Sequence, residues 1–166
     1  MKIAQFLMKT PVGTLSLIAT DRGLRALTGA ADPDVPMVDS LQSPQPAARI
    51  LAHAARELEE YFRGERTEFS VPLDIEGTDF QKKVWSELRQ IPYGATWSYK
   101  QLALRVKDEK ACRAVGAANG KNRLYIVIPC HRVIAGNGAL TGYAGGLEMK
   151  ARLLALEQRP RPSFPF

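Results

Sequence analysis

The chain has 166 residues, of which 45% are hydrophobic and 24% are charged, and its formal net charge is +6. No apolar run approaches the roughly 20 residues of a membrane-spanning helix, which argues against an integral membrane protein. The N-terminal residues lack the apolar core of a signal peptide, so we expect a small globular protein of one or two domains in the cytoplasm.

Cysteine and histidine are scarce in this sequence. Its two cysteines are Cys112 and Cys130, and its two histidines are His53 and His131. Four such residues spread along the chain form no metal-ligand cluster, so we expect no bound metal. A disulfide is not expected either, because a reducing compartment keeps thiols reduced.

The charge is divided unevenly along the chain. Residues 1–76 hold 8 Lys and Arg against 11 Asp and Glu, a balance of −3, whereas residues 77–166 hold 15 against 6, a balance of +9; the two sum to +6. This segregation suggests that the second part meets a polyanion. Before any motif is considered, a solvated basic face without a partner explains the charge equally well.

Residues 1–76 are predicted to form a small α+β domain. Four short β-prone runs, separated by turns or by a proline-rich loop and a helix, predict its strands: residues 2–8, 14–20, 24–29 and 69–75. Apolar residues at helical spacing between Leu51 and Phe62 predict the helix, which Gly64 is placed to end. This part holds no catalytic constellation, and His53 on the helix is expected to be structural.

The second part, from Gly77, is predicted to be mostly helical. Thr78 and Gln81 form a capping box at the start of one helix, and Ser98 and Gln101 form another. The residues expected to face the core behind the first box are Phe80, Val84, Trp85, Leu88 and Ile91.

A third helix is predicted over residues 109–119, with Asp108 as its cap and Gly120 at its end. Two short helices joined by a tight polar turn are typical of a helix-turn-helix, although helix pairs are also common in proteins that never touch DNA. Basic residues near the pair favour DNA binding: Lys100, Arg105, Lys107, Lys110, Arg113, Lys121 and Arg123. The third helix has small side chains nearly all round, and core packing alone would not require Arg113 among them.

Cys130 follows an apolar run, residues 124–128, which is predicted to be a buried strand that Pro129 ends. A free cysteine in such a place is more often a small hydrophobic side chain than a nucleophile. Cys112, among alanines on the third helix, is expected to have that packing role.

Three features favour a nucleophilic Cys130. His131 and Arg132 supply basic or cationic groups that favour the thiolate. The segments AGNG and TGYAGG supply glycine turns whose backbone groups can line a site. Glu157 lies among leucines of the last predicted helix, where a carboxylate needs a partner and can orient a base. Because adjacent side chains point in different directions, Cys130 and His131 would communicate through a bridging water.

These motifs resemble those of one known family. The pentapeptide PCHRV at 129–133, preceded by IVI and followed by TGYAGG, is similar to the signature of the O6-alkylguanine-DNA alkyltransferases, also called methylated-DNA–protein-cysteine methyltransferases. The segments GTDFQKKVW, IPYG, SYKQLA, RAVGAANGKN and LLALE match in the same order, so the resemblance covers about half of the chain continuously.

The resemblance implies the fold class and the division into domains. It implies an α+β chain with a small RNase H-like α/β domain at residues 1–76. A mostly helical domain at 77–158 would bind DNA through a helix-turn-helix that enters the minor groove, and would carry out alkyl transfer. Residues 159–166 are expected to form a loosely ordered tail.

The resemblance also implies catalytic roles. Cys130 would accept the alkyl group, His131 would act as its base through a water, and Glu157 would orient the histidine. Asn122 would brace the turn beside the recognition helix, and Tyr99 would assist base rotation and donate a proton toward guanine N3.

Other residues would contact DNA or the guanine. Arg113 would fill the gap that the rotated base leaves in the duplex. The remaining DNA contacts implied are Tyr99, Lys100, Lys110 and Arg132, and the residues expected around the guanine are Cys130, Val133, Tyr143 and Ala144. No cofactor is implied. Arg123 stands where many relatives have proline, and Ala144 stands where some have serine. Both departures bear on turn rigidity or on tolerance of bulky adducts.

The function implied is DNA repair by direct reversal of damage. After base flipping through the minor groove, an alkyl group would pass irreversibly from O6 of guanine in duplex DNA to Cys130, once per protein molecule. The expected partner is double-stranded DNA carrying O6-alkylguanine, bound by a monomer in the cytoplasm or at the nucleoid and with no membrane contact; activity on O4-alkylthymine and cooperative binding stay open. A thiol-based transcription factor, a cysteine hydrolase and a non-catalytic lesion-binding relative share some of these features, but the last would lack the cysteine.

Overall fold

The computed structural model describes residues 2–107 and 109–159. The predicted Asp108 cap and residues 160–166 of the expected tail lie outside these described ranges. The chain divides into two compact units, of which the first extends to Ile75 and the second spans Glu76–Gln158. Within the described residues, no helix has the length and apolar character needed to cross a membrane.

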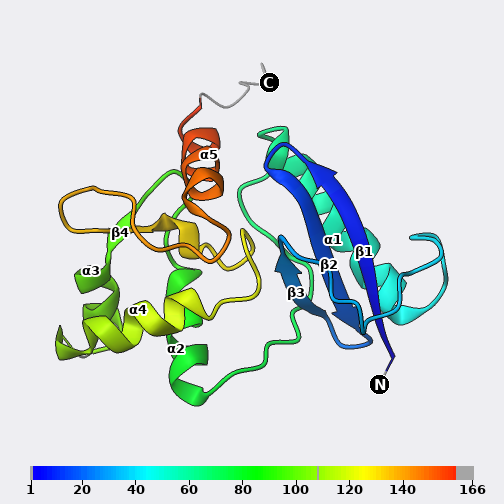
Figure 1. The fold of residues 1–166 in the computed structure, drawn as a ribbon, viewed down its shortest axis with the longest axis horizontal. Coiled ribbons are helices and arrows are strands. Elements are labelled where there is room, and N and C mark those ends of the chain that lie inside the picture. The colour runs from blue at the N-terminus through cyan, green and yellow to red at the C-terminus, as the bar shows by residue number, and fades with distance from the viewer. Residues whose placement is uncertain (1, 108, 160–166) are drawn as a thin grey trace. The chain divides into compact units, whose positions relative to one another are not determined.

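A three-stranded antiparallel sheet and one helix form the first unit (Figure 1). The strands are β1 (Ile3–Thr10), β2 (Gly13–Thr20) and β3 (Leu24–Thr28), and the helix α1 (Pro46–Phe62) lies against one face of the sheet. Fully buried side chains form the core: Leu15, Leu17, Leu24, Leu27, Leu51, Leu58 and Tyr61. The three predicted strands and the helix are confirmed, with Gly64 just beyond the helix end at φ +77°.

Residues 69–75 do not form the predicted fourth strand. They make one isolated parallel bridge, to the first residue of β3. The backbone N–H groups of Ser70 and Val71 donate instead to the carboxylate of Glu57. Of the alternating apolar residues, Val71 is buried and the other three are partly buried. The N–H groups of Ser70 and Val71 bond to a side chain, which sequence periodicity does not reveal.

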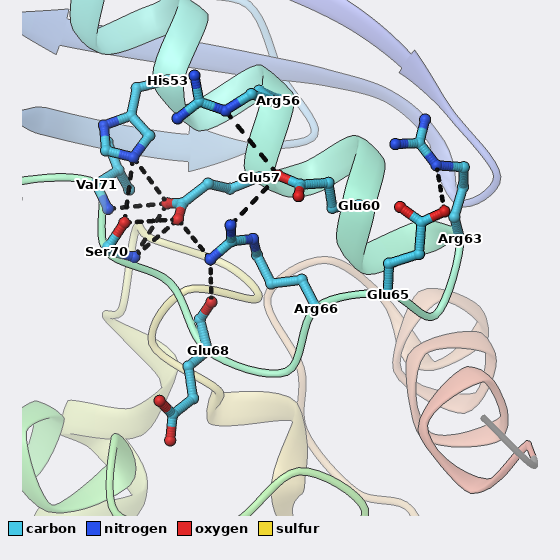
Figure 2. Close-up of polar contacts among 10 residues, drawn as sticks. All are labelled: His53, Arg56, Glu57, Glu60, Arg63, Glu65, Arg66, Glu68, Ser70 and Val71. Carbon is cyan, nitrogen blue, oxygen red and sulfur yellow. Dashed lines mark hydrogen bonds and ion pairs between the residues drawn. The ribbon is translucent and has the colours of Figure 1, made fainter. Parts of the chain in front are cut away.

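Glu57 is a fully buried carboxylate on α1 that fixes this segment (Figure 2). Val71 N and Ser70 Oγ each donate to it at 2.8 Å, and Arg66 Nη1 lies 2.8 Å from its Oε2. Burial alone would raise the pKa of Glu57, but the hydrogen bonds it accepts and the charge of Arg66 outweigh burial and lower the pKa. His53 Nε2 lies 3.2 Å from Ser70 Oγ. We call these five residues the Glu57 cluster.

The second unit consists of four α-helices, short 3-10 turns and two very short strands. In chain order its elements are α2 (Asp79–Leu88), β4 (Trp97–Ser98), α3 (Tyr99–Arg105), η1 (Glu109–Ala111), α4 (Cys112–Gly120), η2 (Cys130–Arg132), β5 (Val133–Ile134) and α5 (Leu147–Gln158). Helix α4 packs against both α2 and α3, and Trp85 Nε1 on α2 donates to the Ala118 carbonyl of α4 at 2.8 Å. Strands β4 and β5 pair in parallel.

Both predicted capping boxes are present. The hydroxyl of Thr78 accepts from the Gln81 N–H while the Gln81 side chain accepts from the Thr78 N–H, and Ser98 and Gln101 make the same exchange. Most of the predicted core face of α2 is buried, namely Val84, Trp85, Leu88 and Ile91. The prediction for Phe80 is wrong, because this residue is 38% exposed and the buried face begins one turn later.

The third predicted helix is divided into η1 and α4. Ala111 occupies the N-cap position of α4 and offers no side-chain acceptor to its first turn. Lys107, in the turn after α3, has a left-handed φ of +65°. Helices α3 and α4 thus pair as expected, but the chain enters α4 through a 3-10 turn.

Residues 124–128 do not form the predicted strand either. The Val127 N–H donates to the Tyr125 carbonyl at 2.7 Å and the Ile128 N–H to that of Leu124 at 2.9 Å, so the segment is a series of tight turns. Ile126 has a φ of +72°, a conformation that is costly for a β-branched residue. The apolar run correctly predicted that this segment is buried, because all five residues are buried. An apolar run alone does not distinguish a buried strand from a buried turn.

Candidate active site

The structure brings together four of the predicted site residues from three segments of the second unit. Cys130 and His131 lie on η2, Asn122 follows α4, and Glu157 lies in the last turn of α5. All four are buried, with exposed fractions between 0% and 4%.

Asn122 connects the turns at 124–128 to the sulfur. Its Nδ2 donates to Cys130 Sγ at 3.1 Å and to the Ile128 carbonyl at 2.9 Å, while its Oδ1 accepts from the Leu124 N–H at 3.0 Å. One amide side chain thus holds both ends of the turn series and the sulfur that follows it. A change at the sulfur would be transmitted directly to the segment that follows α4.

The Cys130 thiol is protonated at rest. Burial raises its pKa to about 11, against the opposing effects of the Asn122 hydrogen bond and the charge of Lys150. Since the thiolate is the nucleophile, this sulfur needs a nearby base at neutral pH.

His131 has the properties of that base. Its Nε2 lies 2.7 Å from Glu157 Oε2, and since an ionised carboxylate only accepts hydrogen bonds, Nε2 carries the proton. Burial lowers the pKa of His131, so the ring is neutral. Its Nδ1 is buried and has no hydrogen-bond partner among the described atoms. A neutral imidazole with an available Nδ1 lone pair therefore lies one residue from the sulfur.

Glu157 remains ionised because two side chains donate to it. Burial alone would raise its pKa, but the hydrogen bonds from His131 and Arg132 outweigh burial and hold the pKa at about 2. Arg132 Nε and Nη2 lie 2.7 Å and 3.1 Å from the two carboxylate oxygens, and Arg132 Nη1 donates to the Ile91 carbonyl at 2.8 Å. The charges of Glu157 and Arg132 balance one another beside the neutral imidazole.

The DNA contact implied for Arg132 is therefore wrong. This side chain is 5% exposed, and its three nitrogens already donate to the carboxylate and to a backbone carbonyl. A phosphate could reach it only by breaking a buried ion pair, which is strongly unfavourable. The resemblance implied this contact, but η2 turns Arg132 inward.

The residues predicted around the guanine lie at the edge of this site. Val133 is fully buried and directly follows η2, while Ala144 is exposed. The Tyr143 ring lies against the Tyr125 ring, with 5.3 Å between centroids and an interplanar angle of 43°. The Tyr143 hydroxyl is buried without a hydrogen-bond partner among the described atoms, and burial raises its pKa. An unpaired buried hydroxyl is costly unless a ligand or water satisfies it.

Tyr99 lies between α4 and the glycine-rich loop. It is the first residue of α3, and its hydroxyl donates to the Thr141 carbonyl over a long 3.4 Å. A Cβ added to Gly116 of α4 would lie 3.9 Å from its ring, and one added to Gly142 would lie 3.6 Å from its hydroxyl. Both neighbours are glycines, which leaves room around the ring.

The other predicted DNA contacts are exposed. Lys100 on α3, Lys110 on η1 and Arg113 on α4 are all solvent-accessible, and we call these three residues the basic face. Cys112 is partly buried at the start of the same helix.

One residue of the site was missed from the sequence. Lys150 on α5 is completely buried, and burial lowers its pKa. Its spacing did carry a signal, because Lys150, Leu153 and Glu157 recur at i, i+3 and i+7 and all three are buried. A lysine on the buried face of a helix needs polar partners, just as Glu157 does.

Both units match models of the same protein family. Residues 3–75 match the ribonuclease-like domain of 6-O-methylguanine DNA methyltransferase, and residues 79–159 match its DNA-binding domain. The chain therefore belongs to the 6-O-methylguanine DNA methyltransferase family, and the predicted resemblance is confirmed.

Individual relatives support the same assignment. A methylated-DNA–protein-cysteine methyltransferase of Mycolicibacterium paratuberculosis is 45% identical over 159 residues, which cover 93% of this chain and 92% of that protein. A constitutive one of Bacillus subtilis is 45% identical over 152 residues, covering 90% and 92%. The crystal structure of the O6-methylguanine methyltransferase of Mycobacterium tuberculosis has a TM-score of 0.84 at 38% identity, covering 98% of this chain and 96% of that one. The same organism's OGT in complex with DNA has a TM-score of 0.82 at 38% identity, covering 95% and 93%. The predicted α+β fold class is confirmed.

Proposed function

We propose that Cys130 is the residue that accepts the alkyl group, and that it does so once and irreversibly. Membership of the family makes this chain a DNA-repair protein that reverses alkylation directly, by transfer to a protein cysteine. The observation that carries the assignment is the geometry of the buried sulfur. Cys130 Sγ accepts a hydrogen bond from Asn122 and lies one residue from a neutral histidine that Glu157 holds at 2.7 Å.

The first step is removal of the thiol proton. His131 Nδ1, for which the described residues offer no hydrogen-bond partner, accepts the proton through a bridging water. Glu157 then stabilises the imidazolium across the 2.7 Å contact, because its own pKa of about 2 keeps it ionised. The Asn122 N–H remains as a donor to the new thiolate and stabilises its charge.

The second step is displacement at carbon. The thiolate attacks the alkyl carbon, a C–S bond forms, and the C–O6 bond breaks with its electron pair moving to the guanine oxygen. Tyr99 assists by donating a proton toward guanine N3, and its long 3.4 Å bond to Thr141 is readily exchanged for that acceptor. The product is a thioether that water does not cleave, so one protein molecule repairs one base.

Access to O6 requires the base to leave the stack. Base flipping costs roughly a few kcal/mol, and insertion of Arg113 from the minor-groove side offsets part of that cost. The small side chains of α4 allow close approach to the groove, while Lys100 and Lys110 on the basic face would contact phosphates. Backbone groups of Cys130, Val133 and Ala144 are proposed to contact the guanine edge, beside the Tyr143 ring.

The proposed partner is duplex DNA carrying O6-alkylguanine, bound by a monomer. A basic second unit and a family DNA-binding domain at residues 79–159 support DNA as the ligand. We expect the protein in the cytoplasm and, when it is bound to DNA, at the nucleoid.

The test is an intact-mass measurement after incubation with excess duplex containing O6-methylguanine. We expect wild-type protein to gain a single CH2 mapped to Cys130 and no more on longer incubation. Cys130→Ser should gain nothing, whereas the matched variant Cys112→Ser should behave as wild type. Repeated turnover would indicate a hydrolase, and binding without any gain in mass would indicate a regulator or a lesion sensor.

A further inference from the structure

We infer that Lys150 is a positioning residue for alkyl transfer: its ammonium closes the loop of residues 134–140 at both ends, and so fixes the backbone beside Cys130 and the Thr141 carbonyl that accepts from Tyr99. The inference rests on the proposed function of Cys130. It concerns a residue for which that function assigns no role.

The contacts of Lys150 define a clamp. Its Nζ donates to the Val133 carbonyl at 2.6 Å and to the Thr141 carbonyl at 2.8 Å, with the Gly142 carbonyl at 3.5 Å. An ammonium group has three N–H donors, so three carbonyls account for all of them. The first acceptor is the residue that directly follows η2, and the other two lie beyond the loop.

The charge of Lys150 is held by carbonyl dipoles. Within the described residues no carboxylate lies within ion-pair distance of its Nζ, although the side chain is completely buried. Burying an ammonium is unfavourable unless strong hydrogen bonds replace water, and bonds from a charged donor are roughly twice as strong as neutral ones. The arrangement is therefore stable only while both ends of the loop remain beside α5.

Apart from the β4–β5 pairing at Ile134, the hydrogen bonds described for this loop are internal, so the loop needs such a clamp. Residues 136–140 of the loop are exposed, and Gly138 adopts a left-handed φ of +84°. Just beyond the loop, Gly142 and Gly146 have φ values of +53° and +95°. Glycine-rich segments lose the most conformational entropy on ordering. Inside the loop the Ala135 N–H donates to Ala139 and the Gly138 N–H to Ala135, but these bonds do not attach the loop to the rest of the unit.

The clamp also reaches the proposed acid. The Thr141 carbonyl accepts from both Lys150 Nζ and the Tyr99 hydroxyl. Tyr99 directly follows β4, which pairs in parallel with β5, the strand that contains Val133. One ammonium thus fixes the acceptor of the Tyr99 hydroxyl and the strand beside the segment that carries Tyr99. Release of the clamp would misplace the proton donor relative to the sulfur.

The test compares Lys150→Met with wild type at saturating O6-methylguanine duplex. Methionine keeps the length and apolar packing of the stem but removes all three donors. We expect the single-turnover rate of mass gain on Cys130 to fall at least about 30-fold, and the amides of residues 135–142 to exchange with deuterium faster. Lys9→Met, which removes an exposed lysine of β1, is the matched control and should keep the wild-type rate.

A double-mutant cycle separates positioning from simple loss of stability. If Lys150 acts through Tyr99, then Tyr99→Phe should slow wild type more than it slows Lys150→Met. Both changes disrupt the same placement of the Tyr99 hydroxyl at the Thr141 carbonyl, so the second change has less left to remove. Lys150→Arg, which keeps the charge and several donors, should recover part of the rate. Lys150→Gln, which keeps two amide donors, replaces Lys150→Met if the latter does not fold.

The outcomes distinguish this inference from the proposed function. A folded Lys150→Met or Lys150→Gln protein with the wild-type rate and unchanged exchange at 135–142 would overturn the inference alone. Wild-type protein that gains no mass would instead overturn the proposed function. Strictly additive effects of the Lys150 and Tyr99 changes would show that Lys150 does not act through the tyrosine.

Discussion

Each unit of the molecule contains a buried glutamate beside a histidine and an arginine, and the two clusters are used differently. Glu57 and Glu157 both have lowered pKa values. Glu57 accepts mainly from backbone N–H groups, of Ser70 and Val71, and so attaches a chain segment to a helix. Glu157 accepts only from side chains in the contacts described above, and so orients them.

The histidines differ in the same way. His53 is partly exposed, and its Nε2 lies near Ser70 and Glu57. His131 is completely buried, with Nε2 fixed by Glu157 and with no partner for Nδ1 among residues 2–107 and 109–159. The same three residue types thus form a structural anchor in one unit and a prepared base in the other. What separates the two is whether a buried proton acceptor is left available.

The largest expected effect tests this contrast directly. Glu157→Gln should lower the rate of alkyl transfer at saturating DNA by about 10²–10⁴-fold, because the histidine loses its orienting group. Glu57→Gln should cost about 1–3 kcal/mol in the free energy of unfolding, since buried donors lose an ionised acceptor, and should leave that rate unchanged. Single-turnover kinetics and thermal melts measure both quantities. Equal losses of rate in the two variants would remove the distinction.

Alkylation of Cys130 should affect the second unit alone. An S-methyl group adds carbon to a packed site and displaces the Asn122 hydrogen bond, so we expect a loss of about 1–3 kcal/mol. Amides of residues 124–128 should exchange faster after reaction, while the Val71 amide, bonded to Glu57, should not. Calorimetry and hydrogen exchange before and after reaction provide the check. Equal thermal stability of the two forms would contradict the prediction.

The smallest expected effect concerns pH. Burial lowers the pKa of His131 below its ordinary value of 6.5, so the folded protein binds fewer protons there than the unfolded chain. The acid limb of the rate of alkyl transfer should therefore have its midpoint below pH 6.5, where the folded His131 becomes protonated. The contribution of His131 to stability has the same sign, being complete above pH 6.5 and declining below it. A rate profile whose acid limb has its midpoint above pH 6.5 would contradict this assignment.

Local signals in the sequence predicted much of the fold. Capping boxes at Thr78 and Ser98 and the termination at Gly64 depend on residues within one helical turn, and the structure contains all three. Failures occurred where the backbone partner is distant or is a side chain. In the segment 69–75, expected to be a strand, two backbone N–H groups donate to the Glu57 side chain. The run at 124–128, also expected to be a strand, is held by hydrogen bonds to the Asn122 side chain.

Sequence reasoning placed some residues of the candidate site and missed or misplaced others. Glu157 was found because a carboxylate on an apolar helix face requires a partner. Arg132 was misplaced because the sequence does not show which way a 3-10 turn directs a side chain. Lys150 was overlooked, although the same argument about a charge on a buried face applied to it. Its partners are three backbone carbonyls, which every residue carries and no sequence pattern marks.

The high pKa of the Cys130 thiol bears on how long the protein lasts between encounters with damage. A sulfur that is 2% exposed and protonated at rest resists peroxide and stray electrophiles, which attack accessible thiolates. A molecule that reacts only once would be inactivated by any such accident. Keeping the sulfur protonated until a damaged guanine enters the site preserves functional copies of the protein.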